Sequence, residues 1–204
     1  MYNLPYTNKQ INIPYLLKIG NGKIYKIGKY LKDKNLPGVA LFLGDGTEEL
    51  VGAELRRGFG DNDINVVHSQ VVSDISIESI TQTAFQLPPA TDVVVGIGGG
   101  KALDFAKYSA HLLRLPFVSV PTSTSNDGFC SPTSSLTVGG RRKTVKSSIP
   151  FGVVIDLDVI RSCPPVFFYS GLGDMVSKIT ALADWKEAAN RKLERYSDFA
   201  SMLA

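Results

Sequence analysis

The chain has 204 residues but only two cysteines and two histidines. Cys130 and Cys163 form neither a CxxC pair nor a cluster of the metal-binding type, which argues against a disulfide scaffold and a zinc knuckle. His68 and His111 lack the partner spacing of a zinc-binding pair, so we expect both to be structural or surface residues. This composition favours the reducing cytoplasm as the location of the protein.

Long apolar runs and strong charge are also missing. No stretch is long enough to span a bilayer, and the N-terminal segment carries prolines and lysines in place of an apolar core, so we expect neither membrane insertion nor export. The net charge of +3 is modest and its basic residues are dispersed, which argues against a nucleic-acid binder. With 44% hydrophobic residues, the chain can still build an ordinary globular core.

Short apolar runs alternate with segments of helical spacing along most of the chain. The continuous runs at 39–43 and 92–97 predict strands that are buried on both faces, which is typical of a parallel sheet covered by helices. Further strands are expected at 64–67, 117–120 and 152–156, a hairpin at 134–146 around Gly139-Gly140, and helices at 48–57, 75–85 and 101–113, the first of them capped by Thr47.

The character of the sequence changes at Pro164-Pro165. Everything from Val166 onward has helical spacing and no strand signal. We therefore expect an α/β dinucleotide-binding domain with a parallel sheet over residues 1–163, followed by the beginning of an all-helical domain over 164–204. The second segment is too short to build an independent core, so we expect it to need further chain or a partner.

Gly98-Gly99-Gly100-Lys101 closes the strand at 92–97 and opens the next helix. Glycines at such a junction let a pyrophosphate approach the free amides and the positive dipole end of the helix. The spacing is not the GxGxxG fingerprint, so a simple tight turn is the alternative interpretation. Asp104 is interpreted as a complement to the helix dipole, and Lys107 as a solvated residue of the helix.

Two other polar segments are candidates for function. The run Pro121-Thr122-Ser123-Thr124-Ser125-Asn126-Asp127-Gly128 follows a strand at the carboxyl edge of the predicted sheet, where open α/β proteins bind ligands, although an exposed polar loop is the alternative. Asp174 precedes the periodic segment 175–189, either as a metal ligand or as a helix cap that Lys178 neutralises. The basic cluster Arg141, Arg142, Lys143 and Lys146 is either a phosphate site or a solvated surface.

Taken together, three motifs resemble the sn-glycerol-1-phosphate dehydrogenases, within the larger group of iron-type alcohol dehydrogenases, glycerol dehydrogenases and dehydroquinate synthases. The motifs are the glycine loop through Asp104, the segment 121–128, and Gly171-Leu172-Gly173-Asp174-Met175-Val176-Ser177-Lys178 with Asp184-Trp185. The resemblance covers nearly the whole chain. It implies interconversion of dihydroxyacetone phosphate and sn-glycerol 1-phosphate, with NAD or NADP as cofactor and assistance from a divalent metal, which is zinc, iron or nickel.

The resemblance also implies roles for individual residues. Asp127 would contact the substrate, a small phosphorylated polyol or ketone, and Asp174 would contact both the substrate and the metal. Asp45, in the adenosine region, would favour a free ribose hydroxyl and therefore NAD. The remaining cofactor contacts would come from Gly98, Gly99, Gly100, Lys101, Ala102, Thr122, Ser123, Thr124, Ser125 and Ser131.

This sequence departs from the family pattern at the metal site, because the family completes that site with two histidines from the later helical domain. The chain ends before them, so we expect a truncated helical domain, completed by a homo-oligomer or a partner chain. Two alternatives follow. One is a non-catalytic nucleotide-binding or partner-docking protein, and the other is a carbocycle-forming synthase of the dehydroquinate synthase type.

Overall fold

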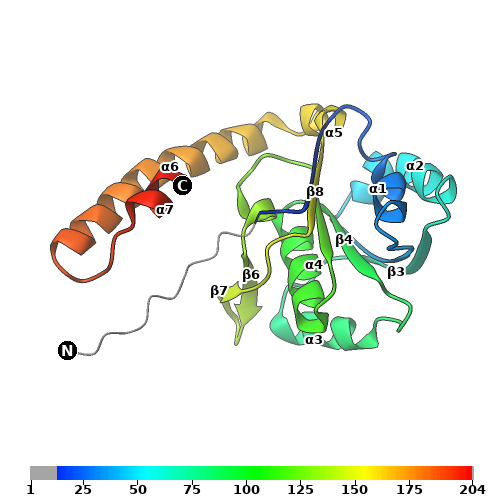
Figure 1. Ribbon diagram of the computed structural model, residues 1–204, viewed down its shortest axis with the longest axis horizontal. Helices are drawn as coiled ribbons and strands as arrows, with labels where there is room; N and C mark the ends of the chain where they lie inside the picture. Colours follow the sequence, from blue (N-terminus) through cyan, green and yellow to red (C-terminus); the bar gives the residue numbers. More distant parts are fainter. Residues whose placement is uncertain (1–12, 204) are drawn as a thin grey trace.

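The computed structural model describes residues 13–203, and its centre is a six-stranded parallel sheet (Figure 1). Each neighbouring pair of strands in this sheet is parallel, which confirms the predicted α/β fold. In sheet order the strands are β1 (Leu16–Gly20), β8 (Gly152–Asp156), β5 (Phe117–Pro121), β4 (Val93–Gly98), β2 (Gly38–Leu43) and β3 (Asn65–Val71).

Helices cover both faces of the sheet. One face is covered by α1 (Ile27–Lys32), α2 (Thr47–Gly60) and α5 (Leu157–Ser162), and the other by α3 (Ile77–Gln86) and α4 (Gly100–Leu113). Alternate residues of β2 enter the two cores: Val39 and Leu41 pack with the first group, and Ala40 and Phe42 with the second. Because both faces are buried, the central strands are apolar throughout, as the run at 39–43 predicted.

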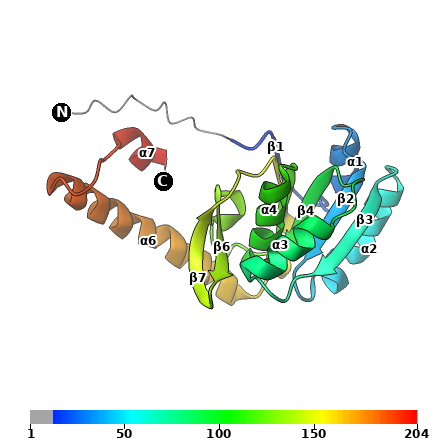
Figure 2. The ribbon, with the colours of Figure 1, turned by 90° about the horizontal axis from the view of Figure 1, so that it is seen from below.

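A two-stranded antiparallel hairpin lies beside the main sheet, near α3 and α4 (Figure 2). It consists of β6 (Thr133–Val138) and β7 (Arg141–Lys146), joined by Gly139 and Gly140, which both have positive φ. This confirms the predicted hairpin, because a tight turn with two positive φ angles favours glycine at both positions. Leu136 of β6 is buried in the same core as α4.

Some expected boundaries are wrong. Thr47 does not cap α2: the cap is Gly46, whose φ of 69° is left-handed, and Thr47 is the first helical residue and is buried. Strand β3 continues to Val71, past the predicted end at 67. It is an edge strand, so polar residues in its second half can reach solvent, and they interrupt the apolar pattern. Strand β1 and helices α1 and α5 were not among the expected elements.

The C-terminal part contains α6 (Pro165–Asn190) and α7 (Asp198–Leu203), and α6 extends away from the sheet (Figure 1). Pro165 is accommodated in the first turn, where no helical N–H is needed. None of the residues described for α6 is buried, and Phe168, Met175 and Ile179 are among its exposed apolar side chains. Among the helices of residues 13–203, none combines the length and apolarity required to cross a membrane.

Candidate functional site

The order of the strands reverses between β2 and β4. From β2 the chain proceeds outward to β3, whereas from β4 it proceeds in the opposite direction to β5. Helices α2 and α4 consequently pack on opposite faces, and the loops that precede them diverge at the carboxyl ends of the two strands. In open α/β sheets, this point of reversal is where ligands bind.

The two neighbouring glycines Gly98 and Gly99 differ in what surrounds them. Gly98 has a φ of 146°, and a Cβ on it would lie 2.9 Å from the nitrogen of Gly44 in the neighbouring loop. Gly99 has ordinary extended backbone, and a Cβ there would meet no protein atom within 4 Å. The fold therefore requires glycine at position 98, whereas position 99 leaves open space in front of the α4 N-terminus, as a phosphate cradle would.

A cleft of about 770 Å³ lies at the same edge of the sheet. Its lining comes from the loop between β2 and α2, the glycine loop before α4, the hydroxyl-rich loop after β5 and the segment around the start of α6. Of the residues expected to bind a cofactor, the lining contains Asp45, Gly99, Gly100, Lys101, Ala102, Thr122, Ser123 and Ser125.

The cleft also has residues that sequence reasoning missed. Val72 and Ser73 follow β3, Cys163 lies just before α6, and Phe167 lies in the first turn of α6. Burial raises the pKa of the Cys163 thiol, which therefore stays protonated near neutral pH. The position after β3 could have been found, because every strand end at this edge of a parallel sheet is a candidate lining segment.

Three predicted cofactor residues lie outside this lining. Gly98 accepts a hydrogen bond from the Thr122 amide at 3.1 Å, which joins the glycine loop to the hydroxyl loop. Thr124 lines a separate pocket against α6. The Ser131 hydroxyl donates to the backbone oxygens of Gly128 and Thr133, at 3.2 and 3.1 Å.

The second pocket, of about 320 Å³, brings Asp127 and Asp174 together. The Asp127 amide donates to a carboxylate oxygen of Asp174 at 3.1 Å, and the Lys178 ammonium lies 2.6 Å from the Asp127 carboxylate. The direct ion pair of Lys178 is thus with Asp127 of the loop, whereas Asp174, the partner expected from the sequence, adds only a weaker Coulombic attraction. The hydrogen bond and the ion pair between Lys178 and the Asp127 carboxylate raise the pKa of Lys178.

Asp174 is not a helix cap, because α6 begins at Pro165 and Asp174 lies inside the helix. The sequence suggested a helix start because Gly171 and Gly173 precede Asp174, and glycine weakens a helix interior. Gly171 is instead required by packing: a Cβ at this position would overlap the carbonyl oxygen of Thr124. Helix α6 thus approaches the loop closely enough for Asp174 to meet Asp127.

The described residues do not fit a complete metal site. Within residues 13–203, no three His, Cys, Asp or Glu side chains are grouped so that they could hold a metal ion. Asp174 supplies one carboxylate, whereas catalytic zinc ordinarily has three protein ligands. His68 lies 3.4 Å from the Gln70 side chain and His111 lies 2.8 Å from the Ser148 hydroxyl, both far along the chain from Asp174.

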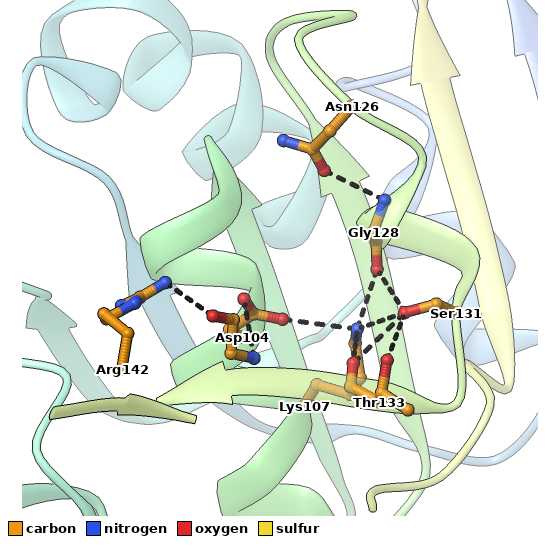
Figure 3. A network of polar contacts seen from close by, with 8 residues as sticks. Asp104, Lys107, Asn126, Gly128, Ser131, Thr133 and Arg142 are labelled. Carbon is orange, nitrogen blue, oxygen red and sulfur yellow. Dashed lines mark hydrogen bonds and ion pairs between the residues drawn. The ribbon is translucent and has the colours of Figure 1, made fainter. Parts of the chain in front are cut away.

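A buried network next to the second pocket was not predicted (Figure 3). Lys107 was expected to be solvated, but its side chain is fully buried. Asp104 does not simply complement the helix dipole, because it accepts a hydrogen bond from the Ser135 amide at 3.2 Å and lies 3.4 Å from the Lys107 ammonium. One sequence signal was available: Lys107 lies on the apolar face of α4, between Leu103 and Ala110.

The basic cluster lies on the exposed hairpin, outside the lining of both pockets. Arg142 donates to the Ser135 hydroxyl at 2.9 Å, across the two hairpin strands. The arginines and lysines of this cluster are exposed, as on a solvated surface.

The sequence model for iron-containing alcohol dehydrogenases matches residues 18–164. The chain is 36% identical over 198 residues to the NAD(P)+ glycerol-1-phosphate dehydrogenase of Metallosphaera sedula, covering 95% of this chain and 55% of the relative. The corresponding enzyme of Methanothrix thermoacetophila is 32% identical over 197 residues, with the same coverage of both chains. The chain therefore spans about half the length of the curated relatives that it matches.

Solved structures show the same fold. The glycerol dehydrogenase of Schizosaccharomyces pombe superposes with a TM-score of 0.74 and 27% identity, covering 83% of this chain and 44% of that one. The sulfoacetaldehyde reductase of Bifidobacterium kashiwanohense, solved in complex with NAD+, superposes with a TM-score of 0.70. At 19% identity, with 83% of this chain and 51% of the other covered, the second likeness concerns the fold alone.

Proposed function

Because the chain belongs to the iron-containing alcohol dehydrogenase family, we propose that it binds NAD or NADP in the 770 Å³ cleft. The observation that carries this proposal is the open space at Gly99, in front of the first amides of α4 and at the point where the strand order reverses. Anions bind at such helix N-termini because the amides and the dipole both favour negative charge. No acidic side chain in the first turn of α4 opposes a phosphate there.

The residues of the cleft fit the different parts of a dinucleotide. The Gly99-Gly100-Lys101-Ala102 turn would hold the pyrophosphate, and the hydroxyls of Thr122, Ser123 and Ser125 would bind the half that leads toward Asp127. Asp45 lies at the other end, after β2, where a carboxylate accepts hydrogen bonds from a ribose diol and repels a 2′-phosphate. The cleft therefore favours NAD.

We further propose that the chain forms part of an oxidoreductase that interconverts dihydroxyacetone phosphate and sn-glycerol 1-phosphate. The printed names of the relatives support this substrate pair, and Asp127 is the proposed substrate contact beside the cleft. The bound dinucleotide would supply or accept the hydride. Asp127 would orient a substrate hydroxyl, and Phe129 and Phe168 would limit water in the same pocket.

Asp174 is proposed as one metal ligand and as a second substrate contact. Its carboxylate holds the Asp127 amide, so the two proposed substrate residues are already fixed relative to each other. The other ligands are not among the described residues, and no catalytic step is derived through a metal. A nucleotide-binding protein without catalytic activity is the second candidate, since Asp174 alone among the described residues is proposed as a ligand where catalytic zinc ordinarily has three.

A titration with NADH followed by a turnover assay tests both candidates. We expect NADH to bind, and oxidation of NADH to begin when dihydroxyacetone phosphate and Zn²⁺ are added. Binding without turnover would favour the non-catalytic candidate. Affinity weaker than about 1 mM for both NADH and NADPH, or roughly 4 kcal/mol of binding free energy, would contradict the cofactor site itself.

A further inference from the structure

Lys107 carries a charge inside the protein that the proposed chemistry does not use. Its side chain is 0% exposed. Lysine is rarely buried to this extent unless its ammonium group is fully paired, because removing the charge from water is costly. The surroundings of this ammonium therefore show what the buried charge accomplishes.

Four acceptors surround the Lys107 ammonium (Figure 3). It donates to the backbone oxygens of Gly128 and Thr133, both at 2.7 Å, and it lies 3.4 Å from the Asp104 carboxylate and the Ser131 hydroxyl. Three of these partners, Gly128, Ser131 and Thr133, belong to one short segment. It runs from η1 (Gly128–Cys130) to the first residue of β6. Lysine has three N–H donors, so this single side chain holds both ends of that segment.

Other bonds extend this anchor along the chain. Asp104, one turn before Lys107 on α4, accepts the Ser135 amide at 3.2 Å, beyond one end of the segment. At the other end, the Asn126 side chain accepts the Gly128 amide at 2.9 Å. Asp127 lies between Asn126 and Gly128. Its side chain is 61% exposed and forms an ion pair with Lys178 of α6, so its position also depends on the backbone that carries it.

Helix α4 connects the cleft with the segment that carries Asp127. Helix α4 starts at the cleft proposed for the dinucleotide, and two turns later it holds the segment next to Asp127. We propose that Lys107, supported by Asp104, is a positioning residue that fixes Asp127 relative to the glycine loop. This inference rests on the proposed function, since Asp127 is there the contact to the substrate. Hydride transfer depends on placement of this kind, because small displacements of reacting groups cost large factors in rate.

An uncharged side chain of similar length could not take this role. Methionine would fill the space but would offer no donor to the oxygens of Gly128 and Thr133. Burial lowers the pKa of Lys107, while the Asp104 carboxylate opposes that shift and favours the charged ammonium. Asp104 thus favours the ammonium form of Lys107, which donates to the backbone oxygens of Gly128 and Thr133.

The test compares Lys107→Met with wild type in two measurements. Hydrogen–deuterium exchange should rise by about tenfold or more in residues 126–135 and stay unchanged in the glycine loop. In the reduction of dihydroxyacetone phosphate, kcat should fall by about tenfold or more while KM for NADH stays within about twofold. Asp104→Asn should show the same pattern more weakly.

Lys101→Met is the matched control, because Lys101 lies on the same helix but is exposed and lines the cleft. It should weaken NADH binding and leave the exchange of residues 126–135 as in wild type. If Lys107→Met does not fold, the same two measurements, exchange in residues 126–135 and kcat, are compared between wild type and the variants Asp104→Asn and Ser131→Ala.

A uniform rise in exchange across the sheet, or a loss of activity that only follows the folded fraction, would overturn the positioning role. Unchanged exchange in 126–135 with full activity would overturn it as well. Failure of the proposed function is a separate result, namely wild-type protein that neither binds NADH nor turns over. The exchange data would then still decide whether Lys107 holds the segment around Asp127.

Discussion

Replacing Gly99 by valine should abolish dinucleotide binding and leave the protein folded, whereas replacing Gly98 by alanine should destabilise the fold. The two residues are neighbours in one loop, but their surroundings differ. At Gly99 the backbone is extended, with a φ of −81°, and the added Cβ meets open space. At Gly98 the φ is 146°, and the added Cβ would lie 2.9 Å from the nitrogen and 3.0 Å from the Cα of Gly44.

The size of each effect follows from these contacts. A non-glycine residue forced into the conformation of Gly98 costs about 1–3 kcal/mol, and each kcal/mol lowers Tm by roughly 2–4 °C for a chain of this size. Valine at position 99 should change stability by no more than about 0.5 kcal/mol. Its methyl groups would occupy the space in front of the α4 amides. Loss of two charge-assisted hydrogen bonds there, about 3 kcal/mol or more, weakens Kd by at least roughly a hundredfold.

Thermal melting of the two variants and calorimetric titration with NADH measure both effects. The expected result for Gly99→Val is a wild-type Tm with no detectable binding. For Gly98→Ala we expect a lowered Tm, with binding that recovers in part at low temperature. The reasoning is refuted if folded Gly99→Val binds NADH as wild type does, or if Gly98→Ala melts at the wild-type temperature.

Three further predictions follow from other contacts. Gly171→Ala should separate α6 from the loop, since its Cβ would overlap the Thr124 oxygen; faster amide exchange in residues 124–128 is expected, and wild-type exchange would contradict the close contact. Asp45→Ala should reduce the ratio of NADH affinity to NADPH affinity in fluorescence titrations, and an unchanged ratio would exclude Asp45 from the ribose site. Because the Asp127 pair raises the pKa of Lys178, its stabilisation is present below the ordinary lysine value of 10.5 and is lost as pH rises through the raised pKa. The Tm difference between wild type and Lys178→Met should therefore persist at neutral pH and vanish only in strong alkali, and a difference that disappears near neutral pH would contradict this assignment.

The central strands were predictable because their signal is local. Strands β2 and β4 are apolar at every position, and both of their faces are covered by helices. Strand β1 gave no such signal: Leu16 is buried, while Leu17 and Ile19 on the same edge strand are 59% and 55% exposed. Its partner in the sheet is β8, at the other end of the domain, and a pairing over that distance leaves no local pattern.

The errors at the site have a common physical cause. Lys107 was expected to be solvated, and the helix-cap alternative for Asp174 was wrong, because composition and spacing describe a helix alone. In the folded chain the loop 122–133 packs against both helices, surrounds the Lys107 ammonium and meets α6 at Gly171. The sequence located the loop and α4, and it indicated a helical C-terminal part, but it placed a helix start beside Asp174 and did not show how closely the loop and the helices pack.

The pairing of β1 with β8 also has a consequence for how the chain folds during synthesis. The amide of Ile24, just after β1, bonds to Asp156 across a separation of 132 residues. On the ribosome, β1 is made well before β8 and has no partner strand until β8 has followed. Contacts this far apart form slowly, because a long loop must close before they contribute. Until then the apolar side chains of β1 are open to other chains, so this strand depends on protection while the domain is being made.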